Sequence, residues 1–302
     1  MWRKLADMQS LWILVAALLF SVMSVLVKLA SEAHSVWEII FWRNAVGLVF
    51  LLQLLRSLSG GIRANLSTPH WPAHLVRNLT GVMSVVLWFS SIPHLPLTTS
   101  MTLNYTSSLF IGLIVFIGAA WQGKHMRNIP MLFALVLGFA GILLVLRPTI
   151  GPEQIVWAVI GLLGGAMGGV AMMSVRALGQ LGEPSSRTVF YFSLGGFLVG
   201  LLGVLLFGFK LPTLEHALYL LGAGLTSVLA QLALTRAYGQ GRALLTANLN
   251  YSGILFASFW GWLIWHDILP LIAWLGIVLI IVAGILATWL TAYEAKPSHG
   301  GD

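Results

Sequence analysis

Ten long apolar segments set the strongest limit on what this chain can fold into. Each contains about 20 predominantly apolar residues, the length that an α-helix needs to cross the hydrocarbon core of a bilayer. Backbone polar groups must be satisfied inside that core, so we expect helices rather than strands and an all-α integral membrane protein. The segments are residues 10–30, 36–55, 73–91, 97–120, 130–147, 155–176, 188–208, 216–237, 243–265 and 270–292.

The composition agrees with a polytopic membrane protein. Of the 302 residues, 58% are hydrophobic and 8% are charged, whereas soluble domains average roughly 45–50% and 25%. The 11 prolines fall between the expected helices or in their first turns, where a missing backbone N–H does little harm. The chain has no cysteine, which excludes disulfides, thiolate metal ligands and thiol nucleophiles.

Positive charges are distributed unevenly between the two ends of the expected helices. Cytoplasmic loops carry the excess of Lys and Arg, so we expect both termini in the cytoplasm. Because these residues lie between apolar segments, we interpret the net charge of +7 as a topology signal and not as a nucleic-acid-binding surface. With that orientation the cytoplasmic side has Arg3, Lys4, Arg56, Arg63, Arg77, Lys124, Arg127, Arg176, Arg187, Arg236, Arg242 and Lys296, and the outer side has Lys28, Arg43, Arg147 and Lys210.

One octapeptide occurs twice in similar form. "LNYTSSLF" at 103–110 lies in the fourth apolar segment and "LNYSGILF" at 249–256 in the ninth, while "AGIL" occurs in both the fifth and the tenth. Shared leucines do not explain an Asn-Tyr pair at the same place in both copies. Five segments per half would insert the second copy upside down. We therefore expect two inverted five-helix repeats, residues 1–150 and 151–302, a plan typical of secondary transporters.

Polar residues inside the apolar segments are candidates for a substrate-binding cavity. If the halves are inverted, Asn104 and Asn250 lie about 6 Å from the membrane midplane on opposite sides. An Asn that faced lipid would be left unpaired at considerable cost. The alternative is that these groups only tie helices together, through hydrogen bonds worth about 0.6 kcal/mol each. The candidate substrate-binding residues are Arg43, Asn44, Trp88, Ser100, Asn104, Tyr105, Tyr191, Gln231, Thr246, Asn250 and Tyr251.

Arg43 is the most deeply placed ionisable residue of the sequence. Ionisable residues within a bilayer are functional candidates, and an Arg fork with Asn and Tyr partners suits a carboxylate or a zwitterion. The alternative is a structural Arg43 that pairs with Glu38 near the outer surface. We interpret Arg77, near the cytoplasmic end of the third segment, as a snorkelling side chain. No carboxylate is expected at the midplane, so permanent cations are poor candidate substrates.

An intramembrane enzyme and a passive channel are the alternatives to a carrier. His70 and His74 have an i, i+4 spacing, but Pro72 lies between them and no third ligand or HExxH pattern is present. The sequence also lacks a GxSxG motif, a glycine-rich phosphate loop and paired acidic residues at membrane depth. We therefore expect no enzymatic activity, no metal and no cofactor. The expected partners are a small-molecule substrate and the lipid bilayer, a homodimer is left open, and a monomer would suffice.

Six stretches spread over both halves carry a family pattern. They are "FWRNAVG" at 41–47, "VRNLTG" at 76–81, "LPLTTSMTLNYTSSLF" at 95–110, "GFAGILLV" at 138–145, "TRAYGQGRALLTANLNYSGILF" at 235–256 and "WGWLIWHDILP" at 260–270. Together they resemble the EamA family of the drug/metabolite transporter superfamily. The resemblance implies ten helices in two inverted repeats, a bacterial inner-membrane location and export of amino acids or related metabolites. Import of riboflavin or S-adenosylmethionine is the alternative that it implies.

The chain departs from that family's pattern at two places. The family usually has Pro after the Tyr-containing word, where this chain has Ser108 and Ile254. Without Pro, a bend there would depend on Gly253 or on the serines that follow Thr106. The family's acidic residue after these segments corresponds to Asp267 in the second half, but Gln122 occupies the matching position in the first.

Overall fold

The computed structural model describes residues 8–107, 109–111, 113, 114, 117, 129–149, 151–241, 246 and 249–294, and the secondary structure of these residues is all helical. Their longest helices are separated by short loops. The elements are α2 (Trp12–Ala30), α3 (Val36–Ser57), α4 (Gly61–Leu66), α5 (Trp71–Ser91), η1 (Ile92–His94), α6 (Leu97–Tyr105), α8 (Ile129–Thr149), η3 (Pro152–Gln154), α9 (Ile155–Gln180), α10 (Ser185–Phe207), α11 (Leu214–Gln240), α13 (Ser252–Trp265) and α14 (Leu271–Glu294).

Six helical segments are long and apolar enough to cross a membrane. They are Met8–Ala30, Val36–Ser57, Trp71–His94, Pro152–Gln180, Ser185–Phe207 and Leu214–Gln240. These six agree with six of the ten expected segments. Of the other four, segments 97–120 and 243–265 include residues outside the described ones and contain α6 and α13, whereas segments 130–147 and 270–292 coincide with α8 and α14. The ten-helix arrangement therefore stays a prediction.

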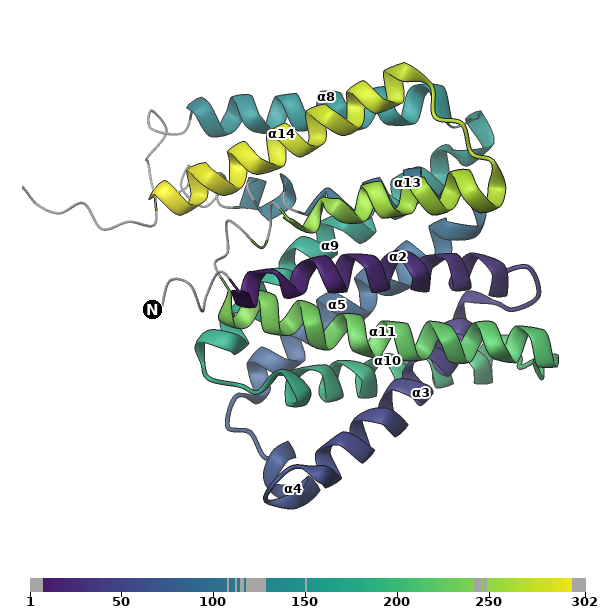
Figure 1. Cartoon of the computed structure of the whole chain (residues 1–302), viewed down its shortest axis with the longest axis vertical. Coiled ribbons are helices and arrows are strands. Elements are labelled where there is room, and N and C mark those ends of the chain that lie inside the picture. Colours follow the sequence, from purple (N-terminus) through teal and green to yellow (C-terminus); the bar gives the residue numbers. More distant parts are fainter. Residues whose placement is uncertain are drawn as a thin grey trace, which may run out of the picture.

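The helices pack mainly in pairs. Helix α5 packs along α9, α2 along α11, α3 along α10, and α8 along α14, while α6 contacts α9 and α13 contacts α2. Figure 1 shows α8 and α14 at one edge of the bundle and α3 with α4 at the opposite edge. The central helices α2, α5, α9 and α11 lie between these edges, so residues from both halves of the sequence form the interior.

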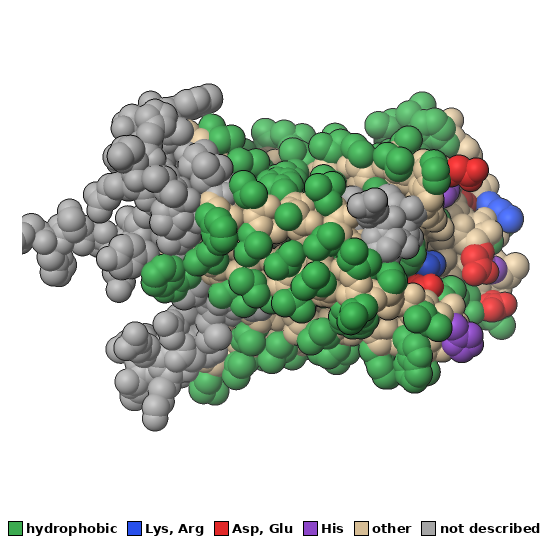
Figure 2. Space-filling view, turned by 90° about the horizontal axis from the view of Figure 1, so that it is seen from above, with side chains coloured by type: hydrophobic (Ala, Val, Ile, Leu, Met, Phe, Trp, Pro, Cys, Tyr) green, Lys and Arg blue, Asp and Glu red, His purple; other side chains and the backbone are tan. Residues whose placement is uncertain are grey.

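The exterior of the bundle is largely apolar. Hydrophobic side chains cover its flanks in Figure 2, whereas charged and histidine side chains visible there gather toward one end. The exposed large residues include Leu163 on α9 and Leu202 and Leu205 on α10. A water-facing surface would not sustain an apolar area of this extent. The described helices therefore present the surface expected of a membrane protein.

Glu183 organises a polar network in the loop between α9 and α10. The residue is 8% exposed. Its carboxylate accepts hydrogen bonds from Thr68 Oγ1 and from Arg187 Nη1, the latter at 3.1 Å, and lies 3.4 Å from His74 Nε2. Thr68 and His74 belong to the first half of the chain and Arg187 to the second. The network therefore joins the two halves at this end of the bundle.

The same network holds the backbone at the end of α4. Arg187 Nε donates a hydrogen bond to the carbonyl of Asn65 at 2.7 Å, and the Tyr191 hydroxyl donates to the carbonyl of Leu66 at 2.7 Å. Trp71 and His74 pack against the Tyr191 ring, with centroids 5.1 Å and 4.8 Å away. Helix α10 thus fixes the connection between α3 and α5 through main-chain acceptors.

The Glu183 network makes stability depend on pH. Burial alone would raise the pKa of Glu183, but hydrogen bonds from Thr68 and Arg187 and the charge of Arg187 outweigh burial and lower the pKa below its ordinary value. The ionised carboxylate therefore stabilises the fold above the unfolded pKa of about 4.3. That stabilisation is lost as the pH falls through the folded pKa.

We expect Glu183→Gln to lower the free energy of unfolding by about 1–3 kcal/mol at neutral pH, because Arg187 loses its charged partner. The difference from the parent protein should shrink as the pH falls through the lowered pKa of the folded state, where the parent carboxylate becomes protonated. Thermal unfolding of the detergent-purified protein at several pH values measures this. Glu153→Gln, at an exposed acid, is the matched control. A pH-independent difference would contradict the role of the charge.

Candidate functional site

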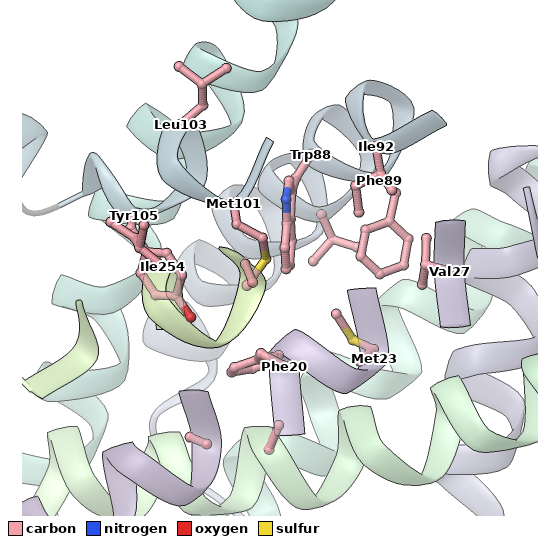
Figure 3. Packing of buried hydrophobic residues seen from close by; sticks show 14 of the residues in the cluster. Phe20, Met23, Val27, Trp88, Phe89, Ile92, Met101, Leu103, Tyr105 and Ile254 are labelled. Atoms are coloured by element: carbon pink, nitrogen blue, oxygen red, sulfur yellow. The ribbon is translucent and has the colours of Figure 1, made fainter. Parts of the chain in front are cut away.

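A cavity of about 60 Å³ lies inside the bundle among α2, α3, α5, α6, α9, α10 and α11. Its polar lining comprises Arg43, Arg77, Ser84, Trp88, Asn104, Tyr105, Ser107, Gln231 and Asn250. Apolar side chains complete the wall, among them Phe20, Val85, Met172, Phe192 and Leu234. In Figure 3, Trp88 of α5 lies near Met101 of α6, and Phe20 of α2 lies on the other side of this interior region. Both halves of the chain therefore contribute to the cavity.

Arg43 reaches the cavity from the first half of α3 and is 3% exposed. Its Nη2 donates a hydrogen bond to Asn44 Oδ1 at 3.2 Å, and Asn44 Nδ2 donates to the carbonyl of Ile40 at 2.7 Å. The Asn44 amide occupies space left by Gly196 of α10, where an added Cβ would lie 2.6 Å from Nδ2. Asn44 thus supports Arg43 from the α3–α10 contact instead of lining the cavity.

Arg77 does not snorkel, contrary to the sequence-based interpretation. The residue is 2% exposed, and its Nη2 donates a hydrogen bond to Gln231 Oε1 on α11 at 3.2 Å. Its guanidinium carbon lies 4.0 Å from the centroid of the Phe192 ring. Gly81, one turn further along α5, provides the space, because a Cβ there would lie 1.8 Å from Arg77 Nη1. The side chain therefore folds inward along its own helix.

Neither cavity arginine has a carboxylate partner among the described residues, whose ion pairs all involve Glu38 or Glu183. The Nε atoms of Arg43 and Arg77 are buried and have no hydrogen-bond partner there. The aromatic rings of Phe89 and Phe192 offset part of the cost, with centroids 5.3 Å and 5.8 Å from the Arg43 guanidinium carbon. Neutral partners orient a buried cation without compensating its charge. The cavity is therefore suited to an anionic group.

Both Asn-Tyr words coincide with interruptions of a helix. Helix α6 ends at Tyr105 and a turn follows at Thr106, while a turn at Tyr251 precedes α13. The Thr106 hydroxyl donates to the carbonyl of Leu103 at 2.6 Å, which satisfies a carbonyl at the break. Gly165 of α9 permits a close approach, since a Cβ there would lie 2.4 Å from that carbonyl oxygen.

These interruptions occur without proline. Bends are expected at Gly253 or at the serines after Thr106, whereas the structure has turns at Thr106 and Tyr251. Ser108 and Gln122 lie outside the described residues. Interrupted helices at the centre of a bundle are typical of substrate sites in transporters. Asn104 and Asn250 both line the cavity beside these turns.

The structure brings six of the eleven candidate residues together around the cavity. They are Arg43, Trp88, Asn104, Tyr105, Gln231 and Asn250. The binding role of these residues stays a prediction. Trp88 adds a buried Nε1 that has no hydrogen-bond partner among the described residues. The sequence interpretation missed Arg77 as a lining residue, although Gly81 four positions later was the available signal.

The other five candidates lie elsewhere. Asn44 lies at the α3–α10 contact. Ser100 Oγ lies 2.9 Å from Ser91 Oγ and links α6 to α5, and the Tyr191 hydroxyl donates to the Leu66 carbonyl. Thr246 Oγ1 donates to the carbonyl of Ala237 at 3.3 Å. Tyr251 packs against Gly284 of α14, where an added Cβ would overlap its hydroxyl. These polar groups are engaged in contacts between or within elements.

Comparisons with known proteins indicate that this chain is a transporter. A model of the EamA-like transporter family matches residues 8–147. A pseudopaline exporter, CntI, of Pseudomonas aeruginosa is 33% identical over 90% of this chain and 92% of its own length. Riboflavin transporters of Vibrio cholerae and Rhizobium johnstonii are 25% and 28% identical, over 96% and 91% of this chain and 95% and 89% of their own lengths.

A solved crystal structure also matches, with a TM-score of 0.70, 18% identity, and coverage of 95% of this chain and 99% of the other. This likeness concerns the fold alone. The apolar helices of the chain, together with its similarity to known transporters, define the protein as a membrane transporter. The chain belongs to the EamA-like family of the drug/metabolite transporter type.

We expect Asn104→Ala and Asn250→Ala to reduce transport while changing the free energy of unfolding by less than about 1 kcal/mol. Neither side chain has a hydrogen-bond partner among the described residues, so little packing energy is lost. Initial transport rates and thermal unfolding of matched folded protein measure the two effects. Asn65→Ala, outside the cavity, is the control. Unfolding without a specific transport defect would instead favour the helix-tie role.

Proposed function

We propose that this transporter is a secondary carrier that exports amino acids or related carboxylate-bearing metabolites across the bacterial inner membrane. The observation that carries the proposal is the buried cavity with Arg43 and Arg77 and no described carboxylate paired to either. Export is supported by the relative named as a pseudopaline exporter. The relatives of this chain are named as transporters, which favours a carrier over an intramembrane enzyme. Transport of a larger metabolite such as riboflavin or S-adenosylmethionine is the second candidate, favoured by the relatives named as riboflavin transporters.

The small size of the cavity supports alternating access. A volume of about 60 Å³ accommodates a few water molecules, whereas ligand pockets typically measure roughly 300–1,000 Å³. A metabolite would need the surrounding helices to separate. The turns beside Asn104 and Asn250 are places where α6 and α13 can change direction without breaking a continuous hydrogen-bond ladder.

The helix contacts support two inverted five-helix repeats, residues 1–150 and 151–302. In this scheme α2, α3, α5, α6 and α8 correspond in order to α9, α10, α11, α13 and α14. Exchanging the halves then turns the α5–α9 contact into the α11–α2 contact, and the α6–α9 contact into the α13–α2 contact. The α3–α10 and α8–α14 pairs exchange with themselves. Such exchange is the property of a two-fold axis.

A second polar network is related to the Glu183 network by the same exchange. In the first turn of α3, Glu38 accepts hydrogen bonds from Ser35 N at 2.8 Å and from Lys210 N at 2.6 Å, and lies 3.4 Å from His34 Nδ1 in the α2–α3 connection. Lys210 belongs to the α10–α11 loop. Each network thus joins a loop of one half to a loop of the other. We infer that the two networks close opposite faces of the carrier and open in alternation.

The function is tested by counterflow of purified protein in liposomes, with amino acids and their amidated analogues as substrates. We expect Arg43→Lys to reduce the initial rate for a carboxylate substrate nearly as much as Arg43→Ala, because an ammonium cannot supply two parallel hydrogen bonds. The initial rate for the analogue without the carboxylate should fall less. Equal fractional losses for both compounds would overturn the carboxylate role. A channel would conduct without counterflow, and an enzyme would convert the substrate in detergent.

Cysteine labelling tests the proposed topology, in which both termini are cytoplasmic. In this cysteine-free chain, single cysteines at Gly151 and Pro212 should react with an impermeant thiol reagent added outside intact cells. Single cysteines at Asn65 and Gly182 should react only after permeabilisation. The reverse pattern would invalidate the orientation, and mixed labelling within one pair would invalidate the inverted repeat.

A further inference from the structure

We propose that the substrate carries two acidic groups and that Arg77 binds the second while Arg43 binds the first. This inference rests on the proposed function and specifies its substrate class as dianionic metabolites, of which dicarboxylates are the simplest. The observation behind it is that two guanidinium groups, and not one, face the same cavity. Both are nearly inaccessible to solvent, at 3% and 2% exposure.

The two cations lie close enough to act on one small molecule. Their guanidinium carbons are 5.8 Å and 4.0 Å from the centroid of the same Phe192 ring, so they lie no more than 9.8 Å apart. Charge-assisted N–H···O bonds extend about 2.7–2.9 Å from each donor. A molecule with two carboxylates separated by a short carbon chain would reach both arginines at once.

The protein holds each arginine with a neutral acceptor. Asn44 Oδ1 takes one N–H of Arg43 and Gln231 Oε1 takes one N–H of Arg77, each at 3.2 Å. An amide oxygen fixes the direction of the guanidinium and leaves its full positive charge. A monocarboxylate would compensate one of the two charges and leave the other unpaired in a low-dielectric interior, which is costly. A substrate with two acidic groups compensates both.

The remaining polar groups fit the rest of such a molecule. Trp88 Nε1 is a donor without a partner among the described residues, and Asn104 and Asn250 offer amides on the cavity wall. None of these groups is a carboxylate, so none would repel a dianion. The cavity therefore combines two fixed cations with neutral donors.

The test compares diacids with their mono-amides on detergent-purified full-length protein. The probes are succinate, glutarate and adipate, together with their mono-amides succinamate, glutaramate and adipamate, at constant ionic strength. We expect the best diacid to bind at least about tenfold more tightly than its mono-amide, seen as a larger rise in melting temperature at equal concentration. The length of the best diacid reports the separation of the two guanidinium groups.

Two carboxamide-to-carboxylate substitutions test the assignment without removing an arginine. Gln231→Glu places a carboxylate against Arg77 and should abolish the preference for the diacid over the mono-amide. Asn44→Asp should weaken both ligands, because it compensates the charge that binds the shared carboxylate. Arg77→Gln should act as Gln231→Glu does. Gln154→Glu, in η3, is the matched control and should retain the diacid preference.

The parent protein could bind diacid and mono-amide equally while Asn44→Asp still weakens binding of the mono-amide. That result would overturn the assignment of a second acidic group and leave the proposed function intact. An unchanged diacid preference in Gln231→Glu would also overturn it. Failure of every acid to bind would reject both this inference and the carboxylate substrate class. Loss of diacid preference in Gln231→Glu and Arg77→Gln alone supports the proposal.

Discussion

Two positively charged side chains must be kept inside an apolar bundle, and much of the central structure serves that requirement. Arg43 and Arg77 cannot be stabilised by lipid, and no described carboxylate is paired with either. Amide oxygens from Asn44 and Gln231 and the ring of Phe192 support them instead. Removing either support would leave a buried cation with fewer compensating contacts, which links the packing of α3, α5, α10 and α11 to the chemistry of the cavity.

The interruptions of α6 and α13 follow from a related constraint. Backbone polar groups at membrane depth must find partners or line a polar space. At Thr106 the side-chain hydroxyl binds a nearby carbonyl, and the glycine of α9 beneath it allows the two backbones to approach. The repeated Asn-Tyr word therefore marks the place where each helix is interrupted by a turn as well as where an amide lines the cavity.

The sequence predicted the features that depend on length and local polarity. Six long helices agree with the expected segments because apolar runs of about 20 residues have few other options in a membrane. Asn44 differs from the expectation because successive helix residues point about 100° apart, so it cannot share the orientation of Arg43. The path of the Arg77 side chain depends on Gly81 and on Phe192, which is distant in sequence. Depth along a helix alone could not reveal it.

Two side chains of α10 hold the α3–α5 connection through its backbone, and this limits how the connection can vary among related chains. Arg187 and Tyr191 bind carbonyl oxygens of Asn65 and Leu66, not their side chains. Every residue type offers the same carbonyl, so amino-acid replacements at these two positions leave the acceptors in place. An insertion or deletion shifts the acceptors out of reach. Positions 65 and 66 can therefore change identity without loss of these two hydrogen bonds, whereas geometry constrains the length of the connection.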